Sequence, residues 1–164
     1  ESGYQGKLFI NLSPKTIVLS EFLPTVRRLM QDYGIEASQM VFEITERDTV
    51  KNLGLIKKSV NDLWQEGFRF AIDDFGSGYS SFQYIRTFNV DFVKVDGEII
   101  RNMTGDRNME KAIVSNIARL AGDLKIKTIA EYVETEAIFG SLQPAGIDYA
   151  QGYYIRHPMP YLVQ

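Results

Sequence analysis

The sequence predicts an α/β protein in which parallel strands alternate with helices. Short apolar runs bounded by turn-forming residues alternate along the chain with segments of helical periodicity. Parallel strands need crossover connections, and helices are the usual connection between them. Two architectures fit this alternation, a doubly wound open sheet and a (β/α) barrel. They place functional residues differently, so the polar positions decide between them.

The first half of the chain shows three strand patterns and two helix patterns. Residues 7–12, 40–45 and 68–73 are short runs rich in β-branched and aromatic residues, which is typical of strands. In residues 20–33 and 50–66, apolar residues recur every three or four positions, which predicts helices with one buried face. Gly34 and Gly67 follow these helices, at a position where glycine commonly ends a helix.

The second half continues the alternation. Strand patterns cover residues 92–95, 127–132 and 149–154, and apolar spacing predicts helices at 109–121 and 135–142. Gly122 follows the first of these helices and Pro144 lies just beyond the second, so we expect the helices to end there. A shorter helix is predicted over residues 80–88. The chain therefore contains six predicted strands joined by helices.

Composition removes several kinds of chemistry. The 164 residues include no cysteine and one histidine, His157, which argues against disulfides, thiol nucleophiles and zinc sites built from cysteine or several histidines. Lys and Arg number 18 against 21 Asp and Glu, a net charge of −3, whereas modules that bind duplex nucleic acid usually carry a basic excess. The chain has no apolar run of about 18 residues and no signal-peptide pattern. Carboxylate, amide, lysine and hydroxyl groups remain for chemistry.

Every predicted strand ends in polar residues. The groups at these ends that can bind a cation or a phosphate are Asn11, Glu43, Asp73, Asp74, Asp96, Glu131 and Gln151. This placement is typical of a (β/α) barrel, whose functional side chains lie at the carboxyl ends of the strands. An open sheet that binds a dinucleotide would carry a glycine fingerprint. Here Gly76 and Gly78 follow a strand, but Ser81 stands where a third glycine is needed.

Polar residues after strands also have a simpler explanation, because they often cap the next helix or turn. Two observations argue that capping is not the whole explanation. Glu43 and Lys94 lie inside apolar runs, where a lone charge is costly. Asp73 and Asp74 are adjacent after a strand, and their mutual repulsion calls for a cation. Carboxylates and an amide favour Mg²⁺ or Mn²⁺, and two such ions suit phosphodiester hydrolysis.

Six short motifs follow one another over nearly the whole chain. They are Asn11-Leu12-Ser13-Pro14, Glu43-Ile44-Thr45-Glu46, Asp73-Asp74-Phe75-Gly76-Ser77-Gly78, Lys94-Val95-Asp96, Ala130-Glu131 with Val133-Glu134-Thr135, and Gln151-Gly152-Tyr153. This set resembles the motifs of EAL domains, the bacterial phosphodiesterases that open cyclic di-GMP to linear pGpG. The resemblance implies a TIM-like (β/α) barrel and metal-dependent hydrolysis of cyclic di-GMP.

The resemblance implies a site for two metal ions, Mg²⁺ or Mn²⁺. Asn11, Glu43 and Asp73 look like ligands of the first ion. Asp73 would bridge to the second ion, which Asp74 and Glu131 would complete.

A catalytic set is also implied by the resemblance. Lys94 is similar to the family lysine that holds the nucleophilic water and balances the charge developing on phosphate. Glu131 and Glu134 match the family positions that act with it. For Glu134 a purely structural explanation stays open, in which it is an acidic residue in the first turn of a helix, stabilised by the helix dipole.

Three further residues match supporting positions. Asp96 would orient Lys94 or a metal-bound water, or else simply end its strand. Gln151 would support the ligand. Glu46 would anchor the loop at residues 75–81, which the family links to metal binding and dimerisation, so we expect a homodimer through this loop.

The chain departs from the family in two places. The Glu-Ala-Leu motif that names the family lies upstream of the Asn11 motif, and the ten residues before Asn11 do not form it. Because its glutamate is a ligand of the first metal, we expect catalysis by this fragment to be impaired. Tyr132 stands where the family usually has glycine. One alternative function is therefore an impaired cyclic di-GMP receptor that acts through a protein partner, and another is an interaction module without nucleotide.

Length sharpens the fold prediction. Six βα units over residues 8–154 take about 25 residues each, so eight units would need roughly 200 residues. We therefore expect an incomplete barrel with about six of eight βα units, in which residues 1–164 are the C-terminal two-thirds to three-quarters of an EAL-type domain. The resemblance adds an upstream sensor or GGDEF-type domain. We expect a cytoplasmic location, which is compatible with a membrane anchor elsewhere in the full-length protein.

Overall fold

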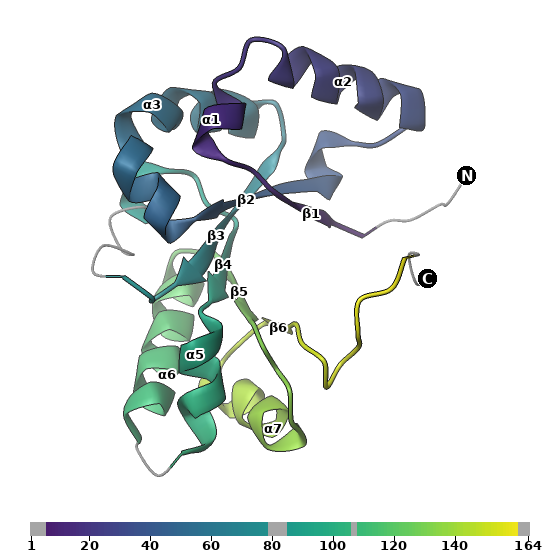
Figure 1. Ribbon diagram of the computed structural model, residues 1–164. Coiled ribbons are helices and arrows are strands. Elements are labelled where there is room, and N and C mark those ends of the chain that lie inside the picture. Colours follow the sequence, from purple (N-terminus) through teal and green to yellow (C-terminus); the bar gives the residue numbers. More distant parts are fainter. Residues whose placement is uncertain (1–5, 79–84, 106–107, 161–164) are drawn as a thin grey trace. The chain divides into compact units, whose positions relative to one another are not determined.

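The computed structural model describes residues 6–78, 85–105 and 108–160, without the side chains of residues 46–53, 55 and 108 (Figure 1). The strands are β1 (Leu8–Asn11), β2 (Met40–Thr45), β3 (Arg69–Phe75), β4 (Phe92–Val95), β5 (Lys127–Ala130) and β6 (Tyr149–Ala150). The helices are α1 (Pro14–Ile17), α2 (Phe22–Tyr33), α3 (Glu46–Gln65), α5 (Gly97–Arg101), α6 (Asn108–Asp123) and α7 (Glu136–Ala145), with single 3₁₀ turns at Ala37–Gln39 and Asn102–Thr104.

Strand order in the sheet follows the order of the chain, from β1 to β6. The pairs β1–β2, β4–β5 and β5–β6 are parallel. A doubly wound sheet reverses its strand order at a switch point, and this sheet does not. The topology is therefore that of a (β/α) barrel with six strands.

The chain divides into two compact units, and the boundary falls inside β3. One unit holds the described residues up to Ile72 together with Gly78–Val90, and the other holds Asp73–Ser77 together with the described residues from Asp91 onward.

Aromatic packing forms the core of the first unit. Phe42 on β2 is buried, and its ring centroid lies 5.4 to 5.8 Å from those of Phe22, Phe68 and Phe70. Strands β1 and β2 pair in a register that places Asn11 opposite Glu43. Two of the residues that the sequence selected in this unit, Asn11 and Glu43, therefore lie opposite each other on neighbouring strands.

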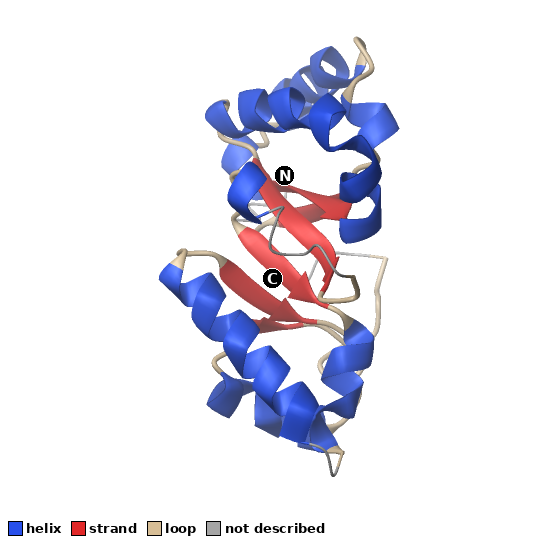
Figure 2. Ribbon diagram, turned by 90° about the vertical axis from the view of Figure 1, so that its left-hand side faces the viewer, coloured by secondary structure: helices blue, strands red, loops and turns tan. Residues whose placement is uncertain are grey.

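Aliphatic side chains fill the core of the second unit. Strands β4 and β5 contribute Val93, Val95 and Ala130, and helices α5 and α6 contribute Ile100 and Val114, all fully buried. Figure 2 shows α6 running alongside the strands that it covers. In the described part of the chain, no helix has the length and apolar character needed to cross a membrane.

All six predicted strands are present, but four have other bounds. Strand β1 is one residue shorter at each end, and β3 starts one residue later and runs two residues further, to Phe75. Strands β2 and β4 have the predicted bounds, whereas β5 ends two residues early and β6 four residues early. The chain turns after Ala130 because Tyr132 adopts a left-handed backbone with φ of 52°. After Ala150 the backbone folds back, and Arg156 N–H and Ile155 N–H donate to the carbonyl of Gly152.

The helix predictions need more correction. Helix α3 begins at Glu46, four residues before the predicted start. Helix α6 runs through Gly122, its predicted stop, to Asp123. Helix α7 continues through Pro144 and ends before Gly146, whose φ is 84°. Helices α1 and α5 have four and five residues, too few to show periodicity, and were not predicted. For the predicted helix at 80–88, residues 85–87 are helical and residues 80–84 lie outside the described part.

Candidate functional site

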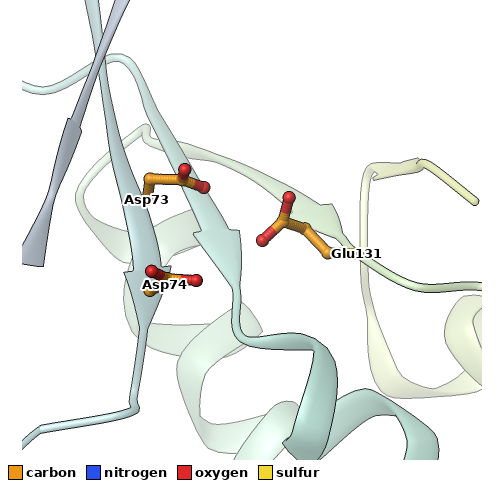
Figure 3. A group of neighbouring side chains, drawn as sticks. All are labelled: Asp73, Asp74 and Glu131. Atoms are coloured by element: carbon orange, nitrogen blue, oxygen red, sulfur yellow. The ribbon is translucent and has the colours of Figure 1, made fainter. Parts of the chain in front are cut away.

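Three carboxylates meet at the carboxyl ends of two strands in the second unit. Asp73 and Asp74 lie near the end of β3, and Glu131 directly follows β5. One carboxylate oxygen of each lies within 4.8 Å of those of the other two, and Figure 3 shows the carboxylates turned toward one another. The structure thus brings these three predicted residues together, with Asp73 and Asp74 inside β3 rather than after it.

Lys94 on β4 supplies a cation to this cluster. Its Nζ lies 2.8 Å from Asp73 Oδ1 and 2.9 Å from Glu131 Oε1. The Lys94 side chain is 6% exposed, so both ion pairs are shielded from water. Because β4 lies between β3 and β5 in the sheet, a side chain on β4 reaches carboxylates from both neighbours.

The cluster carries more negative than positive charge. Burial alone would lower the pKa of Lys94, but its bonds to Asp73 and Glu131 outweigh burial and raise the pKa above the ordinary range for lysine. Burial raises the pKa of Glu131, the ammonium of Lys94 offsets part of that rise, and the charges of Asp73 and Asp74 add to it. Three carboxylates against one ammonium thus leave a carboxylate that costs free energy to ionise.

The backbone beside the cluster is in an uncommon conformation. Asp74 and Tyr132 have φ values of 55° and 52°, in the left-handed region. Among the described residues other than glycine, Lys125 alone shares this property. For an L-residue this conformation costs roughly 1–2 kcal/mol, and such strain concentrates at functional sites.

The residues of the cluster fit a hard divalent cation. All three ligand side chains offer oxygen, which Mg²⁺ and Mn²⁺ prefer. Asp73 Oδ1 is buried and, although it lies close to Lys94 Nζ, it accepts no well-directed hydrogen bond from any described residue. A bound cation would satisfy this oxygen and would compensate the excess negative charge.

A cavity of about 320 Å³ adjoins the cluster and shares Glu131 with it. Its other lining residues include Arg101, Tyr132, Glu134, Gln151 and Tyr153. This volume is at the lower end for small-molecule sites, which usually combine apolar and aromatic walls with a few polar groups.

The predicted supporting residues Asp96 and Gln151, and the predicted catalytic residue Glu134, lie outside the carboxylate cluster. Asp96 is the N-cap of α5, because its Oδ1 accepts from Glu98 N–H at 2.8 Å. Glu134 precedes Thr135, the N-cap of α7, so it is not an acidic residue in the first turn of that helix. Glu134 lines the cavity with Gln151 instead.

The remaining predicted site residues lie in the first unit, and some of their side chains are not among those that the structure describes. Asn11 is exposed, and Glu43 is 6% exposed. Glu46 begins α3, but its side chain is outside the described part. Of the loop at 75–81, residues 79–81 are also outside it, so the dimerisation prediction is untested.

Sequence reasoning missed Arg101 and Gly97, which come from the unpredicted helix α5. The sequence gives little indication of this helix, because five residues are too few to show helical periodicity. An Asp96 N-cap directly after a strand was the one clue to a helix start.

Comparison with known proteins identifies the family. Residues 2–158 match the EAL domain family. Over 151 residues, 92% of this chain, the sequence is 40% identical to the cyclic di-GMP phosphodiesterase PdeF of Escherichia coli and 37% identical to the cyclic di-GMP phosphodiesterase PdeB of Shewanella oneidensis. The chain spans about a fifth of the length of these relatives, 20% and 18%.

Solved structures show the same fold. BlrP1 of Klebsiella pneumoniae, solved as manganese and as calcium complexes with cyclic di-GMP, is 32% identical with a TM-score of 0.84. The match covers 90% of this chain and 38% and 37% of those chains. The prediction of an incomplete TIM-like barrel is confirmed, and the chain belongs to the EAL domain family.

Proposed function

We propose that this chain is the catalytic part of a phosphodiesterase that hydrolyses cyclic di-GMP to linear pGpG with Mg²⁺ or Mn²⁺. The observation that carries the proposal is the cluster of Asp73, Asp74 and Glu131 beside the buried Lys94, with a cavity of about 320 Å³ next to it. The names of PdeF and PdeB, and the cyclic di-GMP bound to BlrP1, support the choice of substrate.

Asp73, Asp74 and Glu131 would hold metal through their oxygens, and the family resemblance adds Asn11 and Glu43. Bound metal supplies an activated water and positive charge beside the scissile phosphate. The carboxylates would hold this charge in place, and the burial of Glu131 and Glu43 would strengthen the attraction by limiting access of water.

Lys94 would supply positive charge to the site in this proposal. Its Nζ forms ion pairs with Asp73 and Glu131 at 2.8 and 2.9 Å. The ammonium would add positive charge beside the carboxylates, where charge develops on the phosphate. Although burial would lower the pKa of Lys94, the carboxylates of Asp73 and Glu131 raise this pKa, which favours the charged form.

Two residues of the cavity would bind the nucleotide. Glu134 can accept hydrogen bonds from N–H or O–H groups, and the Gln151 amide can both donate and accept. Asp96 supports the site indirectly, because its cap fixes the start of α5, which carries Arg101 into the cavity wall.

The test is turnover of cyclic di-GMP by the full-length protein with Mn²⁺, with pGpG detected by chromatography. We expect EDTA to abolish turnover and Mn²⁺ to restore it. Asp74→Asn should lower kcat at least about 100-fold because it removes a charged ligand. Asp62→Asn is the matched control, since Asp62 lies in an exposed ion pair with Lys58, and it should leave kcat unchanged.

The outcomes separate the candidate functions. Absence of pGpG from a folded, Mn²⁺-loaded full-length protein would contradict the catalytic proposal. Tight binding of cyclic di-GMP without turnover, measured by calorimetry, would select a receptor. A folded protein that binds no cyclic di-GMP would select an interaction module.

A further inference from the structure

Tyr132 lies against the first turn of helix α5. A Cβ atom at Gly97 would overlap the Tyr132 ring, so the absence of a side chain at Gly97 gives the ring its place. Arg101 follows Gly97 by four residues and therefore lies on the same face of the helix. Its guanidinium carbon is 4.4 Å from the centroid of the Tyr132 ring, a distance typical of a cation–π contact.

Arg101 also holds a carboxylate of the cavity. Its Nη2 donates to Glu134 Oε1 at 3.2 Å, and both residues line the cavity. The side chains of Arg101 and Glu134 are 47% and 40% exposed, so both are partly surrounded by water. The Tyr132 ring and the Glu134 carboxylate together fix the guanidinium, and the guanidinium in turn fixes the carboxylate.

Two backbone hydrogen bonds hold the chain between Tyr132 and Glu134. Val133 N–H donates to the carbonyl of Gln151 at 3.1 Å, and the carbonyl of Val133 accepts from Tyr154 N–H at 3.0 Å. Val133 itself is fully buried. What can still move in this wall is the side chain of Glu134, and Arg101 restrains it.

We propose that Arg101 is a positioning residue, which holds the Glu134 carboxylate toward the cavity, and that Tyr132 fixes Arg101 for this task. Arg101 engages Oε1 of Glu134, which leaves Oε2 to accept an N–H or O–H group of the nucleotide. Tyr132 thereby replaces the usual family glycine with a support for the cavity wall, at the cost of a strained backbone. The inference rests on the proposed function, because it takes cyclic di-GMP as the ligand.

The first test is the kinetics of Arg101→Gln in the full-length protein with Mn²⁺ and cyclic di-GMP. We expect KM to rise about fivefold with kcat within twofold of the wild type, because a restrained binding group is lost and the metal cluster is intact. Arg27→Gln is the matched control, since it breaks another exposed Arg–Glu pair, with Glu66, in the first unit. This control should leave KM unchanged.

The second test asks whether Tyr132 acts through Arg101. Tyr132→Phe keeps the ring and should retain the wild-type KM, whereas Tyr132→Leu should raise KM as Arg101→Gln does. The double variant Tyr132→Leu/Arg101→Gln should be no worse than either single variant. Thermal melting of every variant checks that the fold is retained.

The result that overturns the inference is a KM for Arg101→Gln equal to that of Arg27→Gln, or independent effects that multiply in the double variant. A wild-type protein that binds and hydrolyses cyclic di-GMP would leave the proposed function standing in that case. A wild-type protein that does neither overturns the proposed function, and the inference with it.

Discussion

At the scale of single residues, Lys94 controls the electrostatics of the cluster. Replacing Lys94 by Met leaves Asp73 and Glu131 buried without their cation, and breaking a buried pair in this way costs about 3 kcal/mol. We expect Lys94→Met to be destabilised by this amount in metal-free buffer. Because the negative charge is then uncompensated, Mn²⁺ should raise its Tm more than that of the wild type, as calorimetry can measure.

Lys58→Met is the control for this prediction. Lys58 is 89% exposed and pairs with Asp62 at 3.5 Å, so its loss should change the free energy of unfolding by less than about 0.5 kcal/mol. An equal Mn²⁺ effect on Lys94→Met and the wild type would contradict the charge argument.

Individual residues also show where sequence reasoning works. Lys94 and Glu43 could be selected because a charge inside an apolar run is costly without a partner, and Lys94 proves to be paired. Asp73 and Asp74 were selected because they are adjacent at the end of the predicted strand, although β3 continues through them to Phe75. The contact of Arg101 with Tyr132 and Glu134 could not be found, because it depends on a left-handed φ and on a glycine 35 positions away from the ring.

At the scale of elements, the segments after β5 and β6 pack backbone against backbone. A Cβ at Gly152 would overlap the main-chain atoms of Val133, which cannot yield as a side chain would. Gly152→Ala should therefore destabilise the protein by about 1–3 kcal/mol in urea unfolding. Gly122→Ala is the control, because Gly122 lies in α6 with open space around it, and it should stabilise by about 0.5–1 kcal/mol. Equal effects would contradict this account.

Strand β6 has two residues and depends on Asp148, which precedes it. Asp148 Oδ2 accepts from Thr128 N–H at 2.9 Å and from Thr128 Oγ1 at 3.0 Å, and Oδ1 accepts from Lys127 Nζ at 2.6 Å. Burial would raise the pKa of Asp148, but Lys127 and Thr128 outweigh it and lower the pKa. Asp148 therefore stabilises the fold above the ordinary carboxyl pKa, and this contribution disappears as pH falls through the lowered value.

Asp148→Asn should accordingly lower the free energy of unfolding by about 1–2 kcal/mol at pH 7. The difference from the wild type should shrink as the pH is lowered from about 5 toward 3. Urea unfolding at several pH values measures it, with the exposed Asp123→Asn as the control. A difference that stays constant over this range would contradict the role of the charge.

Helices and strands could be predicted where a pattern of apolar residues extends over many positions or where the whole strand is buried. Strands β2 and β4 are buried along most or all of their length, and their continuous apolar runs gave the correct bounds. Strand β6 was predicted too long because its run of apolar and aromatic residues continues beyond Ala150, and the turn at Gly152 depends on contact with Val133. Helix α7 passes the predicted stop at Pro144 because the left-handed Gly146 provides the actual C-cap.

At the scale of the whole molecule, the proposed metal ligands come from both units. Asp73, Asp74 and Glu131 belong to the second unit, and Asn11 and Glu43 to the first. If all five residues bind metal, Mn²⁺ should slow hydrogen exchange of amides at the carboxyl ends of β1 and β2 as well as β3 and β5. Exchange measured by mass spectrometry on the full-length protein tests this. Protection confined to β3 and β5 would restrict the ligands to the second unit.

Strand β1 presents apolar side chains to solvent. Phe9 and Ile10, which are adjacent on this strand, are 39% and 41% exposed. Exposed apolar side chains next to each other favour association between molecules. We therefore expect Phe9→Lys to raise the concentration at which this chain stays in solution, as light scattering can measure.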